Sequence, residues 1–125
     1  MYDLVLDAQE AWAHYAIEGS PGPACPADIA DALTVIDREE AGTVMAYLSA
    51  GDLVFPGRLC RDREHVLRAA ERVVKLLGWD STWWTNIEAS DAGHGRNPVS
   101  RFSFDGVVAG ACNGIVVALL QVGED

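Results

Sequence analysis

The chain of 125 residues is predicted to fold as an α+β protein, with N-terminal helices packed on a C-terminal antiparallel β-meander of three to four strands. Apolar residues recur at helical spacing through much of the first 77 residues, whereas the last third contains short β-rich runs separated by turn dipeptides. The length suits one core, and a composition of 50% hydrophobic and 22% charged residues is typical of a chain that folds. We therefore expect a single globular domain over residues 1–125.

Four helices are expected, at about residues 2–17, 27–36, 38–50 and 63–77. The first has amphipathic spacing, and the second follows Pro26, a residue favoured in the first turn of a helix. Asp37 and Glu40 have the spacing of a capping box at the start of the third helix. Asp62 is a suitable N-cap for the fourth helix, and Gly78 is a suitable stop.

Four strands are expected, at about residues 82–89, 99–104, 107–112 and 115–122. Asp105-Gly106 and Asn113-Gly114 are typical of type I′ turns, so the last three strands should form the meander, with 82–89 as its fourth strand. The last two strands are almost continuously apolar, which indicates that both faces of the sheet are at least partly covered. Residues 91–97 have the composition of a loop.

The charge is strongly acidic and unevenly distributed. Nineteen acidic and nine basic residues give a formal net charge of -10, which argues against direct binding to nucleic acids or anionic membranes. Residues 1–57 contain ten acids and a single base, Arg38. We therefore expect the chain to bind a protein with a basic surface. The candidate binding residues are Asp3, Asp7, Glu10, Asp28, Asp31, Glu39, Glu40, Trp83 and Trp84.

Two groups of residues, the neighbouring tryptophans and the basic residues of the fourth helix, leave alternatives open. Trp83 and Trp84 must point to opposite faces of a strand, so at most one fits easily in the core, and the other is either an interface anchor or a cover for the second face. Basic residues at helical spacing in 63–77 form either a solvated face or a contact with the acidic first helix, in the same chain or in a second copy. A structural subunit of a homo-oligomer is therefore another possible function. The basic residues are His65, Arg68, Arg72 and Lys75.

A small enzyme or small-ligand binder is the main alternative function. His94 has the chemistry of a general acid or base, Asp91 of its orienting partner, and Arg96 of an anion clamp, with Asn97 and the tryptophans beside them. The same residue types also suit an exposed loop. The sequence lacks a nucleophile elbow and a dinucleotide-binding fingerprint.

The cysteines and the amino terminus complete these expectations. Cys25, Cys60 and Cys112 are widely spaced, so we expect free thiols, no metal site and no cofactor. An acidic start and the lack of a 20-residue apolar stretch favour a cytoplasmic protein that neither spans nor binds a membrane. In size and acidity the chain is similar to bacterial toxin-immunity proteins and to phage proteins that block host defences, and this resemblance implies a toxin or a defence enzyme as the partner. The preferred hypothesis is a non-enzymatic inhibitor or immunity-type module.

Overall fold

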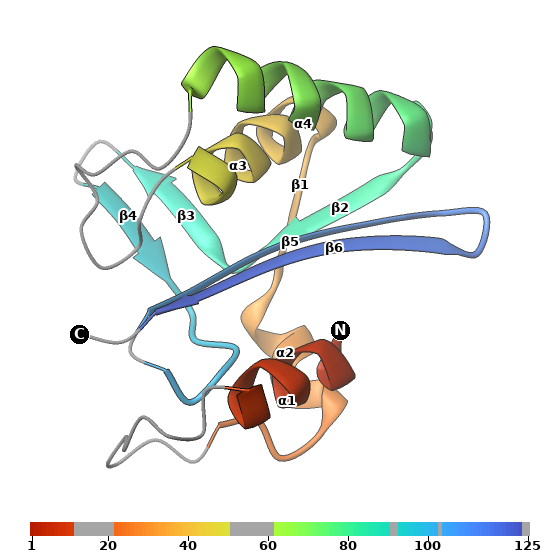
Figure 1. The fold of residues 1–125 in the computed structure, drawn as a ribbon. Coiled ribbons are helices and arrows are strands. Elements are labelled where there is room, and N and C mark those ends of the chain that lie inside the picture. Colours follow the sequence, from red (N-terminus) through yellow and green to blue (C-terminus); the bar gives the residue numbers. More distant parts are fainter. Residues whose placement is uncertain (12–21, 51–61, 91–92, 103, 124–125) are drawn as a thin grey trace.

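The molecule is built around a four-stranded antiparallel sheet (Figure 1). The computed structural model describes residues 1–11, 22–50, 62–90, 93–102 and 104–123. The sheet has the strand order β1-β2-β5-β6. Its strands are β1 (Thr34–Ile36), β2 (Thr82–Thr85), β5 (Phe104–Cys112) and β6 (Ile115–Gly123). A separate hairpin consists of β3 (Ile87–Ser90) and β4 (Gly93–Arg96).

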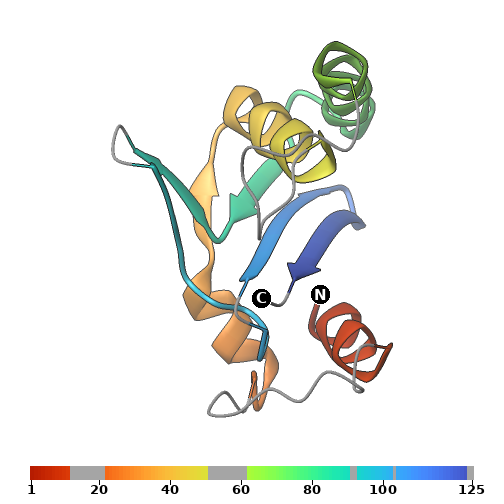
Figure 2. The same cartoon turned by 60° about the vertical axis from the view of Figure 1, so that its left-hand side comes forward.

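Helices cover both faces of this sheet, as Figures 1 and 2 show. The helices on one face are α3 (Arg38–Ala50) and α4 (Arg63–Leu77), which pack against each other. The helices on the other face are α1 (Tyr2–Ala11) and α2 (Pro26–Ala32). The predicted α+β class, with an antiparallel sheet, is confirmed.

Local capping explains where the two longest helices begin. The Asp37 Oδ1 atom accepts a 2.8 Å hydrogen bond from the Glu40 amide at the start of α3. At the start of α4, the Asp62 Oδ1 atom accepts a 3.0 Å bond from the Glu64 amide. Each bond satisfies an amide that has no partner within its own helix, and both helices have the predicted bounds.

The two N-terminal helices differ from the expected bounds. The helix α1 is described as far as Ala11, and residues 12–17 of the expected helix lie outside the described residues. The helix α2 ends at Ala32, whereas the prediction extended it to residue 36. Residues Thr34–Ile36 instead pair with β2, because this β-branched run gains a strand partner that lies far away in the sequence.

The core between the sheet and α3–α4 is centred on Trp83. This side chain is completely buried, and it packs with Met45, Leu48 and Val74 from the two helices. Its ring lies directly over Gly110 of β5, where an added Cβ atom would come within 2.6 Å of the indole. The absence of a side chain at this glycine therefore creates the space that the tryptophan occupies.

A second, smaller core lies between the sheet and α1–α2. Val5 and Ile29 pack there with Val107 of β5. A hydrogen bond of 3.1 Å from the Tyr2 hydroxyl to the Ala24 carbonyl joins α1 to the segment that precedes α2. Together these contacts cover part of the sheet face that lies opposite α3 and α4. The apolar sequences of the last two strands predicted that both faces would be at least partly covered.

Two expectations for the C-terminal region are wrong. Residues 99–102 form bends instead of a strand, and Asp105-Gly106 lies inside β5 instead of at a turn. Gly106 has a packing role, because a side chain at this position would collide with Leu48 of α3. The predicted turn at Asn113-Gly114 is confirmed, since both residues have positive φ values, 50° and 81°.

The expected strand 82–89 is divided at Asn86 between the main sheet and the β3–β4 hairpin. The expected loop 91–97 is also wrong in part, because its residues 93–96 form β4. The Asn86 carbonyl accepts a 3.0 Å hydrogen bond from the Asn97 amide, so the start and the end of the hairpin are tied together.

A buried carboxylate organises this junction. Asp105 is 2% exposed, and its Oδ1 atom accepts a 2.8 Å bond from the Asn86 side-chain amide. Its Oδ2 atom accepts bonds of 2.9 Å from the Ser100 amide and 2.7 Å from the Ser100 hydroxyl, and both oxygens receive the Val99 amide. The Asn86 Oδ1 atom in turn accepts a 2.8 Å bond from the Val107 amide. We call Asn86, Ser100 and Asp105 the junction network.

The substitution Asp105→Asn should destabilise the fold by about 2–4 kcal/mol. Whichever way the new amide is turned, its NH₂ group faces donors that the carboxylate now satisfies. Urea unfolding at neutral pH measures the change, with the exposed Asp7→Asn as the control. An unfolding free energy within about 0.5 kcal/mol of the wild type would contradict this role.

Candidate functional site

The short strand β1 forms one edge of the sheet and presents an apolar side chain to solvent. Val35 is 63% exposed, and it is the register partner of Trp84 on β2. Since neighbouring residues of a strand point to opposite faces, the burial of Trp83 under α3 places Trp84 on the other face, where it is half-buried. The expectation that only one of the two tryptophans belongs to this core is confirmed. The assignment of Trp83 as a binding residue is wrong, because none of its surface is exposed.

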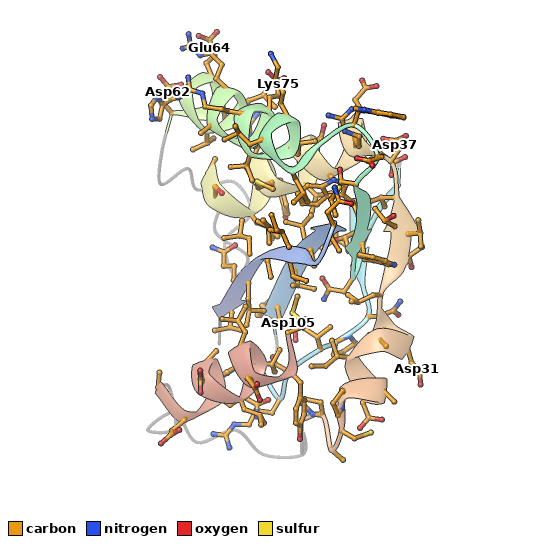
Figure 3. The ribbon with its side chains drawn as sticks, turned by 90° about the vertical axis from the view of Figure 1, so that its right-hand side faces the viewer. Asp31, Asp37, Asp62, Glu64, Lys75 and Asp105 are labelled. Carbon is orange, nitrogen blue, oxygen red and sulfur yellow. The ribbon has the colours of Figure 1, made fainter. Side chains whose placement is uncertain are left out.

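Acidic side chains lie at both ends of β1. Figure 3 shows Asp31, at the end of α2, and Asp37, at the start of α3, on the same side of the molecule. The two residues are at most roughly 20 Å apart, because six residues of extended chain reach no further. Glu40 lies close to Asp37, because its backbone amide donates a 2.8 Å hydrogen bond to the Asp37 Oδ1 atom.

We call this arrangement the β1 surface, which consists of Asp31, Val35, Asp37, Glu40 and Trp84. Its three carboxylates belong to exposed residues, and within the described part of the chain none of them forms an ion pair. An apolar centre therefore lies between negatively charged side chains. Such a surface complements a partner with an apolar side chain flanked by Lys or Arg.

The other predicted acidic residues lie elsewhere. Asp3, Asp7 and Glu10 are exposed on α1, which contacts β6 at the opposite edge of the sheet from β1. Asp28 caps its own helix, since its Oδ2 atom accepts bonds of 2.8 Å from the Ala24 amide and 3.3 Å from the Cys25 amide.

Glu39 lies apart from the β1 surface, in a groove between α3 and α4. This hollow of about 400 Å³ is also lined by Arg38, Glu71 and Lys75. Bases and acids alternate there, so the groove has no single sign of charge. The described acidic residues of the N-terminal half thus form separate groups, and none of these groups follows from counting charges along the sequence.

The basic residues of α4 do not contact α1 within one molecule. The two helices lie on opposite faces of the sheet, as Figure 1 shows. The four basic residues of α4 are all exposed: His65, Arg68, Arg72 and Lys75. The expectation of an intramolecular contact between these residues and the acidic first helix is therefore wrong.

Two residues of the alternative catalytic site lie in a hairpin strand instead of a loop. His94 and Arg96 are residues of β4, opposite Ala89 and Ile87 respectively. Asp91 lies outside the described residues, as do the side chains of His94 and Arg96. The main chain of Asn97 belongs to the junction, because its carbonyl accepts a 2.9 Å bond from the Asn86 side chain. This interaction gives Asn97 a structural role that the sequence did not indicate.

One cysteine has a chemically distinct environment. The Cys112 thiol donates a 3.2 Å hydrogen bond to the Asp80 Oδ1 atom. This bond raises the pKa of Cys112 above its usual value, with smaller contributions from desolvation and from the negative charge of Asp80. The environment disfavours the thiolate, which is the opposite of what a cysteine nucleophile requires. Cys25 is an exposed free cysteine, and Cys60 lies outside the described residues.

The remaining features of the described residues concern metal binding, membrane spans and likeness to known proteins. Among the described residues, no group of three His, Cys, Asp or Glu side chains is placed to hold a metal ion. None of the described helices is long and apolar enough to cross a membrane. The chain matches no protein-family model, no curated protein and no solved structure.

The substitution Asp80→Ala should lower the pKa of Cys112, because it removes the hydrogen bond and the charge that raise it. With Cys25→Ser and Cys60→Ser as background, iodoacetamide then labels a single thiol. The midpoint of its rate against pH should move to lower pH in the Asp80→Ala variant. Superimposable profiles with and without Asp80 would show that this contact does not control the thiol.

Proposed function

We propose that the chain is a non-enzymatic, acidic protein-binding module of the inhibitor or immunity type. It docks through the β1 surface onto a basic site of another protein. The observation that carries this proposal is the pairing of exposed Val35 with half-buried Trp84 between the carboxylates of Asp31 and Asp37.

The contact energy is expected to come from the apolar centre. Trp is among the residues that dominate binding energy when they are covered by a partner, and a rim of polar groups excludes water around it. Trp84 is held in place by β1 on one side and by Ala109 of β5 on the other. A side chain that is ordered before binding loses little conformational entropy on association, which favours affinity.

The carboxylates set which partner is favoured and how fast it arrives. Asp31, Asp37 and Glu40 repel an acidic protein and attract a basic one at short range. The more distant acids of α1 add to a net charge of -10, which accelerates the encounter with a basic partner at low salt. The β1 surface thus makes the direct contact with the partner, and the acids of α1 supply long-range attraction.

The substitution Val35→Lys should abolish capture of the partner, because it places a positive charge in the apolar centre of the β1 surface. The matched control is Val116→Lys, which makes the same change at a valine of similar exposure, 67% against 63%, on the opposite edge strand. Tagged proteins are used to capture partners from a lysate of the source organism, and retention is compared at low salt and at about 0.5 M salt.

The proposal expects a stoichiometric partner that the wild type and Val116→Lys retain at low salt and Val35→Lys loses. Circular dichroism melting establishes that both variants are folded. Equal retention by the two variants would place the contact elsewhere, and the absence of a stoichiometric partner would remove the proposal.

The α1 acids provide an independent prediction once the partner is purified. Reversing Asp3, Asp7 and Glu10 to Lys should slow association several-fold at low salt, since it removes part of the attractive field. The dissociation rate should stay unchanged, because these residues lie away from the contact. Stopped-flow mixing measures both rates, and an association rate equal to that of the wild type at low salt would exclude steering by α1.

A further inference from the structure

The strand β6 is the second edge of the sheet, and its composition is unusual for an exposed edge. Among the described strands, β5 is its only neighbour. Its nine residues contain no charged residue and no proline, and its register with β5 is continuous, with no bulge. Edge strands of monomeric proteins normally carry such features, because they prevent pairing with another chain. The sequence of β6 itself therefore contains nothing that opposes pairing with a further strand.

The hairpin turn determines which backbone groups of β6 face outward. In a two-residue turn such as Asn113-Gly114, the flanking residues Cys112 and Ile115 form a hydrogen-bonded pair. Hydrogen-bonded and non-hydrogen-bonded pairs then alternate along the strand. The amides and carbonyls that point away from β5 are those of Val116, Ala118, Leu120 and Val122.

We propose that β6 pairs in antiparallel fashion with β6 of a second copy of this chain, with a two-fold axis at Leu119. In this register Val116 meets Val122 of the second copy, and Ala118 meets Leu120. All four outward residues then find partners, which gives about eight inter-chain hydrogen bonds. A register centred on Ala118 leaves Val122 without a partner, so the sequence favours the Leu119 axis.

The side chains of β6 suit this self-pairing. Val116 is 67% exposed, and its cross-strand partner in the second copy is a valine. On the opposite face, Leu119 meets Leu119 across the axis. Apolar cross-strand pairs of this kind stabilise an antiparallel sheet. Because β6 contains no charged residue, a second copy can pair with it without placing acids opposite acids within the ladder.

A hollow beside β6 adds to the interface. It has a volume of about 520 Å³ and lies between the strand and the two helices of that face, with Val117 and Leu119 on the strand side and Val66, Ala70 and Val73 on α4. The proposed axis places the second copy's Leu119 next to it. The strand is about 30 Å long, and helix layers stand about 10 Å to either side, so this flank of the molecule is large enough to bury the roughly 800 Å² per partner of a stable dimer.

Disulfide trapping tests both the dimer and its register. In a background in which the three native cysteines are replaced by serine, Leu119→Cys should form an inter-chain disulfide under mild oxidation, because a non-hydrogen-bonded pair brings the two Cβ atoms to about 4.5–5.5 Å. Val117→Cys is the matched control on the same face. Its two copies would lie about 14 Å apart along the strands and should not cross-link.

Sedimentation equilibrium tests the dimer without oxidation. The wild type should be a dimer, and Val116→Lys should raise the dimer dissociation constant more than tenfold, because lysine is a natural block to edge pairing. Val35→Lys should leave the dimer intact. Higher salt should strengthen the dimer, since it screens the repulsion between two chains of charge -10. Higher salt weakens binding to a basic partner, which is the opposite of its expected effect on the dimer. The experiments therefore distinguish a failure of this inference from a failure of the proposed function.

Three results would overturn the inference. The first is a wild type that stays monomeric at about 100 µM in 0.5 M salt. The second is cross-linking of Val117→Cys as efficient as that of Leu119→Cys. The third is loss of a lysate partner from Val116→Lys together with a monomeric wild type, which would assign β6 to a strand of another protein.

Discussion

The buried carboxylate of Asp105 is the constraint on which the arrangement of the sheet depends. It holds Asn86 and the 99–100 bend at the point where β2 leaves the main sheet and β3 begins. The Asn86 Oδ1 atom in turn accepts a hydrogen bond from the Val107 amide, and the Thr85 hydroxyl donates a 2.7 Å bond to the Val107 carbonyl. These two bonds fix β2 against β5. A shift of β2 by one residue would exchange the two faces of the strand. The network thus determines that Trp83 is buried and that Trp84 faces outward.

The two edges of the sheet differ in chemistry, and this difference suggests a division of roles. The edge at β1 is short, and carboxylates surround its exposed valine, which favours a side-chain contact with a basic protein. The edge at β6 is long and uncharged, which favours backbone pairing with an identical strand. In the proposed dimer the two β1 surfaces lie at the outer ends of one continuous sheet, so each remains available to a partner.

The features that the sequence predicted correctly have local causes. The helices α3 and α4 begin at aspartates that cap them, and Asn113-Gly114 adopts the positive φ values of a tight turn. The predictions that were wrong concern segments whose structure depends on residues far away in the sequence. Asp105-Gly106 has the same local signature as a turn, but Asp105 binds Asn86 and Gly106 accommodates Leu48. The acidity of the N-terminal half was evident, whereas its division into separate groups depends on how α1, α2 and α3 are placed around the sheet.

A double-mutant cycle between Asn86 and Asp105 tests the central claim most directly. Urea unfolding of Asn86→Ala, Asp105→Ala and the double variant measures how strongly the two side chains stabilise one another. If the junction network acts as a unit, the coupling free energy should be about 1–3 kcal/mol, because each single substitution removes one hydrogen bond from the other buried side chain and disturbs its remaining partners. Effects that add to within about 0.5 kcal/mol would show that the two residues act independently. The orientation of β2 would then have another cause.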